Sequence, residues 1–243
     1  SQYRAPALES EVPIGGGGNG PAATAILVDV GAAQQGYGWI FPKRECLSVG
    51  VGEFRRKSKG LHATFDRFVT DERGVIGGTV PRPAGHPIPV YAESEGRRQD
   101  MESGFVANRV ALVGDAAHLV DPLFGEGIYY AIRSGQLAAH AILAHHDNHH
   151  ESLAAYEMAL EHEILPDFRV TARIARVIYA FPRLAFKLLG RYQDVVQDYF
   201  GVLQGDMTAQ QFLPHAKKRL KASVSDLLLE ALHLREMGET DER

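Results

Sequence analysis

Residues 109–132, RVALVGDAAHLVDPLFGEGIYYAI, constrain the fold most, because they read as strand, tight turn, loop and helix in immediate succession. Residues 110–113 have the length and β-branching of a buried strand, and Gly114 lets a ligand approach the backbone without a Cβ in the way. Helical spacing follows at the apolar positions Ile128, Ala131, Ile132, Gly135, Ala138 and Ile142. The free N–H groups and the positive dipole end of such a helix attract anionic groups. The segment therefore predicts an anion-binding turn between a strand and a helix.

The segment resembles the second FAD fingerprint of the p-hydroxybenzoate hydroxylase-like flavoproteins, a GD motif followed by a proline loop and a GEG helix start. The resemblance implies that Gly114 and Asp115 lie along the pyrophosphate and ribityl chain, and that the helix start lies beside the pyrimidine edge of the isoalloxazine. The cofactor-binding residues that it implies are Gly114, Asp115, Pro122, Gly125, Glu126, Gly127 and Ile128. The alternative is a generic strand, loop and helix with a capping aspartate.

A second motif predicts a β-hairpin with an aromatic face. Tyr37, Trp39 and Phe41 alternate to one side of a predicted strand, and the next strand carries small residues at the same spacing. A two-residue turn at positions 43 and 44 would pair each aromatic residue with a small one, Tyr37 with Gly50, Trp39 with Ser48 and Phe41 with Cys46. Such a face would form an aromatic wall with a floor low enough for a long apolar ligand.

The same residues, YGWIFP followed after seven residues by GVG, resemble the signature of the geranylgeranyl reductase family. The resemblance implies a substrate-binding face made by Tyr37, Trp39, Phe41, Gly50 and Gly52. An ordinary core hairpin, whose aromatic residues are buried for packing, is the alternative interpretation.

The two resemblances imply an α+β fold, the FAD/NAD(P)-binding p-hydroxybenzoate hydroxylase-like fold without its N-terminal dinucleotide-binding motif. They divide the chain into a substrate-binding antiparallel sheet region (1–105), a second FAD-binding segment (106–147) and a C-terminal helical region (148–243). Gly15, Gly17 and Gly20 have GxGxxG spacing, but the preceding SEVPI is short and proline-broken for a central strand, and residues 25–30 predict a strand where a helix is required. We interpret these glycines as a hairpin tip and expect the chain to be part of a longer protein.

Turn residues separate predicted strands at 25–30, 36–41 and 46–54, which form a meander. A helix is expected at 59–69 and an extended, proline-rich stretch at 75–90. No residue is identified as the catalytic proton donor; water, Cys46 and His86 all stay open. The histidine tract at 144–150 is interpreted as a helix end, and no metal site is predicted, because histidine at a helix C-terminus is favoured by the dipole alone.

Composition agrees with a soluble α+β protein that lies against something apolar, and the expected location is the cytoplasm, with peripheral contact at a membrane. The formal net charge of -4 argues against nucleic-acid binding, and one cysteine excludes an internal disulfide. No stretch of about 18 consecutive apolar residues could span a bilayer.

A basic stretch in the C-terminal third has two open interpretations. Its cations fall near one helical face: Arg169, Arg173, Arg176, Arg183, Lys187 and Arg191. Pro182 should break the run into two helices. The pair either docks on an anionic membrane from which a lipid substrate is drawn, or is a core helix pair with a solvated basic face.

The resemblance implies a FAD-dependent oxidoreductase that transfers hydride to a carbon–carbon double bond of an isoprenoid chain, with NAD(P)H or another reductant as the electron donor. A related monooxygenase, halogenase or quinone-linked dehydrogenase is the first alternative. An inactive lipid-binding fragment without flavin is the second.

Overall fold

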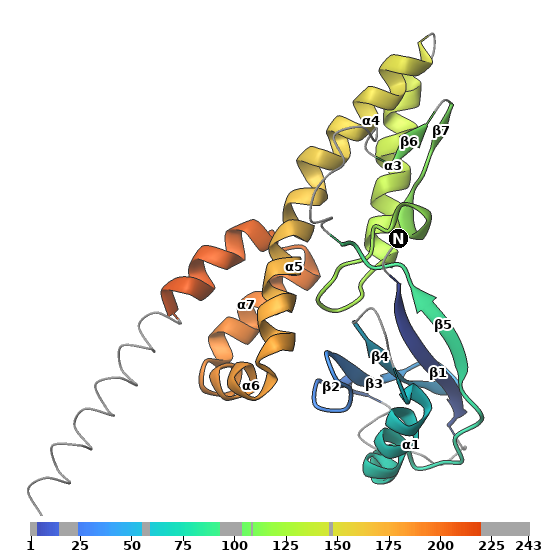
Figure 1. Cartoon of the computed structure of the whole chain (residues 1–243), viewed down its shortest axis with the longest axis vertical. Helices are drawn as coiled ribbons and strands as arrows, with labels where there is room; N and C mark the ends of the chain where they lie inside the picture. The colour runs from blue at the N-terminus through green and yellow to red at the C-terminus, as the bar shows by residue number, and fades with distance from the viewer. Residues whose placement is uncertain are drawn as a thin grey trace, which may run out of the picture. The chain divides into compact units, whose positions relative to one another are not determined.

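The computed structural model describes residues 4–14, 24–54, 59–92, 104–107, 109–145 and 148–219 (Figure 1). The chain divides into two compact units, Ser1–Pro182 and Arg183–Arg243. The first contains an antiparallel sheet and three long helices, so the predicted α+β class is confirmed. The predicted glycine-rich hairpin tip lies outside the described residues.

A five-stranded antiparallel sheet forms the first half of the first unit. Its spatial order is β2 (Leu27–Asp29), β3 (Gly36–Pro42), β4 (Cys46–Glu53), β1 (Ala5–Pro13) and β5 (Ala84–Ile88). The predicted meander corresponds to β2, β3 and β4 and is confirmed. Sequential strands joined by short connections lie next to one another, as is usual in such sheets.

The prediction that the segment before the glycines is too short and proline-broken for a central strand is wrong. It ends β1, a nine-residue strand that lies between β4 and β5. The prolines fit because Pro6 lies opposite Pro87, where neither strand has an N–H to offer, and because Pro13 is the last residue of the strand. Both pairings of β1 are antiparallel, unlike those of the opening strand of a dinucleotide-binding fold.

The predicted register of the β3–β4 hairpin is wrong by two residues. Tyr37 lies opposite Gly52, Trp39 opposite Gly50 and Phe41 opposite Ser48. The last pair is Pro42 with Leu47, and the N–H of Lys43 donates to the carbonyl of Cys46 (2.8 Å), so the connection is longer than the expected turn. A shift of two keeps every side chain on its face, and each aromatic residue still faces a small one.

One face of the sheet packs on α1 (Leu61–Asp71), which begins two residues later than predicted. Ile40, Val49 and Val51 are fully buried there against Phe65 and Phe68 of the helix. A short helix, α2 (Arg73–Ile76), occupies the start of the predicted extended stretch, which continues into β5. Because α1 covers this face, the aromatic row is directed to the opposite face.

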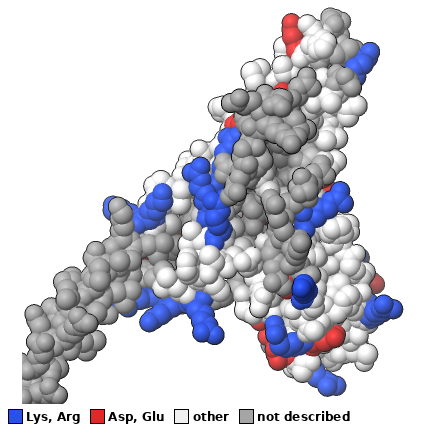
Figure 2. Space-filling view, viewed as in Figure 1, with Lys and Arg blue, Asp and Glu red and all other residues white. Residues whose placement is uncertain are grey.

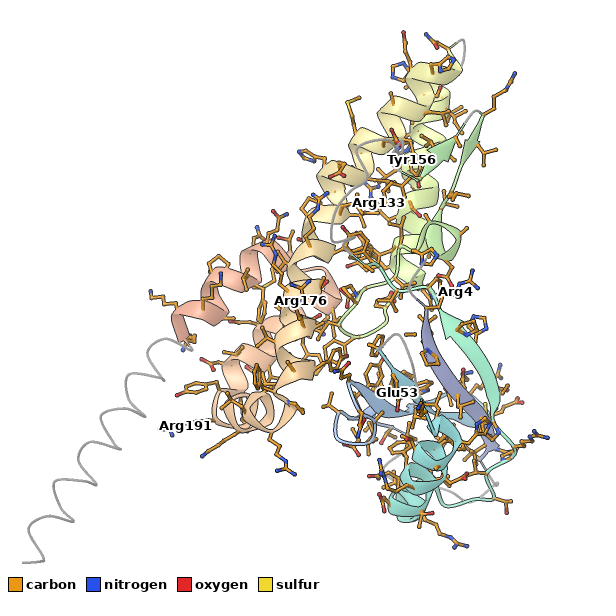
Figure 3. The ribbon with its side chains drawn as sticks, in the orientation of Figure 1. Arg4, Glu53, Arg133, Tyr156, Arg176 and Arg191 are labelled. Atoms are coloured by element: carbon orange, nitrogen blue, oxygen red, sulfur yellow. The ribbon has the colours of Figure 1, made fainter. Side chains whose placement is uncertain are left out.

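Three helices make the second core of this unit: α3 (Ile128–Ala144), α4 (His149–Glu163) and α5 (Leu165–Ala180). Helices α3 and α4 lie side by side (Figure 1). Tyr156, on the side of α4 that faces α3 (Figure 3), is buried with Leu160 and Phe168. Helix α3 ends at Ala144 and Asn148 caps α4 through its side chain, so the histidine tract contains a helix end, as predicted.

The burial prediction for the strand before α3 is wrong. The expected buried strand is a two-residue strand, β7 (Val110–Ala111), and the side chains of Val110 and Val113 are exposed. Its partner in the described residues is β6 (Val106–Ala107) alone, so no sheet covers these valines. In α3, Ile128 and Ile132 are exposed, because the face that meets α4 and the preceding turn is a different one: Ser134, Leu137, Ala138 and Ala141.

The second unit begins with α6 (Pro182–Arg191) and α7 (Gln193–Gln204). Helix α5 ends at Ala180 and α6 starts at Pro182, so the predicted break at this proline is confirmed. No helix in the described ranges is long and apolar enough to cross a membrane.

Candidate functional site

The GD motif forms a tight turn that rests directly on α3. Gly114 has a left-handed φ of 54° and begins the 3-10 helix η2 (Gly114–Ala117). Its N–H donates to the hydroxyl of Ser134 (2.9 Å), and a Cβ at this position would lie 2.9 Å from Cβ of Ala131. The turn therefore requires glycine both for its backbone conformation and for its close approach to the helix.

Asp115 lies exposed at this turn and is directed toward the start of α3. A Cβ added to Gly127, the residue that precedes α3, would lie 3.4 Å from the Oδ1 atom of Asp115. The structure thus brings together Gly114, Asp115 and the GEG helix start, which are separated by ten residues in the sequence. An exposed carboxylate can accept hydrogen bonds from ligand hydroxyls.

The expectation that the first N–H groups of α3 are free is wrong. The carboxylate of Glu126 accepts from the N–H of Ile128 (3.2 Å) and from that of Tyr129 (2.9 Å). A carboxylate at this end of a helix satisfies donors that have no partner within the helix and interacts favourably with the dipole. An anionic ligand at this helix start therefore competes with the Glu126 side chain.

A buried aspartate that the sequence analysis did not identify organises the loop before α3. Asp121 is 3% exposed, and its Oδ1 atom accepts from the N–H groups of Leu123 and Phe124 (2.9 Å each). Main-chain bonds also join Asp121 to Glu126 (2.8 Å) and Gly125 to Asp121 (2.9 Å), which closes the loop on itself. Burial raises the pKa of the Asp121 carboxyl, whereas hydrogen bonds from Thr171 and from the two amides oppose this shift. The signal for this loop was the Asp-Pro pair, which is typical of a turn closed by an aspartate side chain.

Two tyrosine hydroxyls hold the carbonyls of the same loop. The hydroxyl of Tyr37 donates to the carbonyl of Phe124, and that of Tyr179 donates to the carbonyl of Leu123 (2.5 Å). Burial raises the pKa of Tyr37, and the nearby carboxylates of Asp121 and Glu126 raise it further. Tyr37 therefore stays protonated and acts as a hydrogen-bond donor over the whole physiological pH range.

The indole of Trp39 occupies the space that was predicted to form a low floor. Its Nε1–H donates to the hydroxyl of Ser48 (3.0 Å), which in turn donates to the carboxylate of Glu9 (2.5 Å). A Cβ at Gly50 would lie 2.1 Å from the indole, so the Trp39 ring packs directly on the backbone of Gly50. We call this position the seat of the indole. Glycine is needed here because the indole lies across β4 to reach Ser48. The Trp39–Ser48–Glu9 chain is a second feature that the sequence analysis missed.

The aromatic residues form one continuous row along β3. The ring centroids of Tyr37 and Trp39 are 5.9 Å apart, and those of Trp39 and Phe41 are 6.2 Å apart. Tyr37 and Trp39 are buried, whereas Phe41 is partly exposed. Phe54 and Phe124 belong to the same cluster, so the aromatic face of the sheet contacts the loop before the GEG helix start.

Two other candidates lie on neighbouring strands. His86 is exposed in β5 opposite Ala7, a member of this cluster, and Cys46 is the first residue of β4. Within the described residues, no group of three His, Cys, Asp or Glu side chains could hold a metal ion. His146, Asp147 and the side chain of His149 lie outside the described part of the chain.

Two solved structures share this architecture. A geranylgeranyl bacteriochlorophyll reductase-like protein from Thermoplasma acidophilum superposes with a TM-score of 0.54 at 23% identity, covering 73% of this chain and 44% of that one. The flavin-dependent brominase Bmp2 gives a TM-score of 0.55 at 16% identity, covering 90% of this chain and 56% of that one. The fold is therefore that of the p-hydroxybenzoate hydroxylase-like flavoproteins.

Sequence comparison identifies proteins that are similar to this chain. No family model matches the chain. The chloroplastic geranylgeranyl diphosphate reductase of Arabidopsis thaliana is 36% identical over 151 residues, which are 59% of this chain and 30% of that protein. The chain is thus a relative of the geranylgeranyl reductases, which confirms the resemblance seen in its two motifs. It spans between 21% and 33% of the length of the geranylgeranyl and digeranylgeranylglycerophospholipid reductases that it matches.

Proposed function

We propose that the chain is part of a FAD-dependent oxidoreductase of the geranylgeranyl reductase type, which reduces carbon–carbon double bonds of isoprenoid chains. The observation that carries this proposal is the packing of the Gly114 turn and Asp115 against the start of α3, in a chain related to those reductases. Bound FAD would supply the hydride. The reductant is NAD(P)H or another small electron donor.

The residues present fit a flavin at this position. Gly114 and Gly125 both have left-handed backbone conformations (φ 54° and 70°), Asp115 offers an exposed carboxylate to ligand hydroxyls, and Gly127 has no side chain to obstruct the helix start. In this proposal Pro122 shapes the loop, and Glu126 and Ile128 border the pyrimidine edge. The Glu126 carboxylate must leave the amides of Ile128 and Tyr129 if an anionic ring edge is to use them.

The substrate is proposed to lie along the aromatic face of the sheet. Phe41 is the most accessible member of the aromatic row, while Trp39 and Tyr37 are buried behind it and support the face. A Cβ added at Gly52 would lie 3.6 Å from the Trp39 ring and 3.9 Å from Cβ of Ala7, so the sheet leaves room for an apolar carbon beside Gly52. Gly50 serves the face indirectly, by seating the indole.

Flavin binding provides the first test. Trp39 is the only tryptophan, and it lies in the cluster that contains Phe124 of the loop. We expect FAD to quench its fluorescence during a titration, and Asp115→Ala to weaken binding. Absence of quenching in the parent chain and in any longer form of the protein would refute the proposal and favour a flavin-free lipid-binding protein.

The product provides the second test. Reduction adds two hydrogens to an isoprenoid chain, whereas a monooxygenase adds oxygen and a halogenase adds halogen, so the mass of the product distinguishes these reactions. An oxygenated or halogenated product would retain the flavin site and refute the reductase.

We also propose that the basic helices contact an anionic membrane surface. Arg173 and Arg176 of α5 are exposed beside Val177, and Phe181 at the end of the helix is 62% exposed. Arg176 is labelled on α5 in Figure 3, and Figure 2 shows Lys and Arg side chains gathered over α5 and over α6. Arg169 does not contribute a free charge, because it pairs with Glu161 (2.6 Å). Exposed cations interleaved with apolar side chains favour the lipid interface.

The membrane test uses a triple variant, Arg173→Gln, Arg176→Gln and Lys187→Gln. Each charge near an anionic surface contributes about 1 kcal/mol, so binding to phosphatidylserine vesicles should fall steeply and should depend on salt. Lys59→Gln, Arg73→Gln and Arg82→Gln, three exposed cations elsewhere, form the control of equal charge. Equal vesicle binding by both triple variants would refute the contact.

A further inference from the structure

The loop from Asp121 to Glu126 has no regular secondary structure, yet it is largely buried. Asp121, Pro122 and Leu123 are all buried, and Gly125 has a left-handed φ of 70°. Buried main-chain groups require hydrogen-bond partners, because an unpaired group is costly. Side chains supply these partners here: a carboxylate for two amides and two phenols for two carbonyls.

The two phenols come from elements far apart in the chain. Tyr37 belongs to β3 and lies 87 positions before Phe124, while Tyr179 belongs to α5 and lies 56 positions after Leu123. The ring of Phe54 packs against both tyrosine rings. Phe54 stacks on Tyr37 at a centroid distance of 5.6 Å and on Tyr179 at 5.6 Å with an interplanar angle of 9°. The same phenylalanine would lie 3.3 Å from a Cβ at Gly125.

The loop leads directly into the helix start. The N–H of Asp121 donates to the carbonyl of Glu126, and the carboxylate of Glu126 caps the first amides of α3. A displacement of the Leu123 or Phe124 carbonyl would therefore be passed through this closed loop to Glu126 and Gly127. The position of the helix start depends on the hydroxyls that hold the loop.

We propose that Asp121, Tyr37 and Tyr179 form a three-point clasp that fixes the loop and, through it, the Glu126–Ile128 segment against the flavin. They are positioning residues, and the hydroxyl of Tyr37 serves the cofactor side while its ring belongs to the aromatic face of the sheet. The clasp is a property of the chain itself, whereas its role toward flavin rests on the proposed function.

Hydrogen exchange tests the clasp without a cofactor. Tyr37→Phe and Tyr179→Phe retain the stacked rings and remove one hydroxyl each. The amides of residues 123–126 should exchange about two- to tenfold faster in each variant, as expected for the loss of one hydrogen bond to a carbonyl, and faster still in the double variant. Tyr156→Phe is the matched control, since it removes a tyrosine-to-carbonyl hydrogen bond (2.7 Å, to Leu112) outside the loop. Equal exchange of the loop in Tyr37→Phe and Tyr156→Phe would overturn the clasp.

Replacement of Asp121 tests whether its side-chain oxygen, rather than the volume of its side chain, holds the loop. Asp121→Asn keeps a carbonyl oxygen for the amides of Leu123 and Phe124 and should preserve slow exchange, whereas Asp121→Ala leaves both amides unpaired and should release the loop. Similar exchange in these two variants would overturn the role of Asp121. Trp39 emission, which reports the neighbouring cluster, should match that of the parent in the folded Tyr37→Phe and Asp121→Asn variants.

A flavin titration then tests the second half of the proposal. Tyr37→Phe and Tyr179→Phe should each weaken FAD binding about two- to tenfold and shift the flavin absorbance bands, because the helix start is less well fixed. Faster loop exchange with unchanged FAD affinity and spectrum would overturn the link to the cofactor. A parent protein that binds no flavin would refute the proposed function, and the exchange measurements would still decide on the clasp.

Discussion

The two glycines of the GVG motif should respond in opposite ways to alanine. At Gly50, a Cβ would lie 2.1 Å from Cζ2 of Trp39 and 2.6 Å from the carbonyl oxygen of Leu8. The carbonyl belongs to the neighbouring strand and cannot move away, so the indole must leave its seat and lose its hydrogen bond to Ser48. Overpacking costs about 1–3 kcal/mol and the hydrogen bond about 0.5–1.5 kcal/mol. Gly50→Ala should therefore lower the free energy of unfolding by about 1.5–4.5 kcal/mol.

Gly52→Ala is the matched control, two residues further along the same strand. Its Cβ would meet Trp39 at 3.6 Å and Ala7 at 3.9 Å, which are ordinary contacts, and Gly52 has no positive φ. Alanine should then stabilise the chain by about 0.4–1 kcal/mol, because it restricts the unfolded state. Urea denaturation followed by Trp39 fluorescence measures both variants, and the native emission should move to the red in Gly50→Ala alone. Equal stabilities and equal emission would refute the assignment of Gly50 as the seat of the indole.

Three further predictions concern the carboxylates. Asp115→Ala should weaken FAD binding by about 1.5–3 kcal/mol in a form of the protein that binds it, as for a hydrogen bond with a charged partner, and an unchanged dissociation constant would remove Asp115 from the site. Glu126→Gln should tighten the binding of reduced, anionic flavin by about 0.3–1 kcal/mol, because a neutral cap no longer repels it; equal affinity of parent and variant would show that Glu126 does not compete with the flavin. Burial raises the pKa of Asp121, so the folded chain holds this proton more tightly than the unfolded chain. The unfolding free energy of the parent relative to Asp121→Asn should therefore fall as the pH rises from about 4 through the raised pKa, and a constant difference over that range would contradict the assignment.

Local patterns were sufficient for the elements of the sheet and failed where a pairing depends on distant segments. The meander followed from turn residues and strand-length runs, and the break at Pro182 followed from the chemistry of proline. The register of β3 and β4 depended on the length of one connection, which the pair Lys43-Arg44 did not reveal. The role of β1 depended on Pro6 meeting Pro87 across the sheet, about 80 residues away, and no local pattern predicts that coincidence.

In the candidate site, too, local patterns were sufficient within one segment and failed for contacts between distant segments. Its glycines and Asp115 lie within one segment of the sequence, and the structure brings them together at the start of α3. Asp121 and Tyr179 were missed because an aspartate before proline usually marks a solvated turn, and because a tyrosine in a basic helix suggests a surface position. This loop lies in the interior because it is covered by residues from other elements: Tyr37, Phe54 and Thr171.

Four exposed apolar side chains lead to a last prediction. They all lie in the segment that the resemblance assigns to flavin: Val110, Val113, Ile128 and Ile132. Apolar surface of this kind binds hydrophobic dyes, and a flavin ring that covers the helix start should displace them. Ile128→Ser and Ile132→Ser should reduce dye binding and abolish its displacement by FAD. Ile142→Ser, at the far end of α3 and also exposed, should reduce dye binding while displacement persists. Displacement that survives Ile128→Ser and Ile132→Ser would place the flavin elsewhere on the chain.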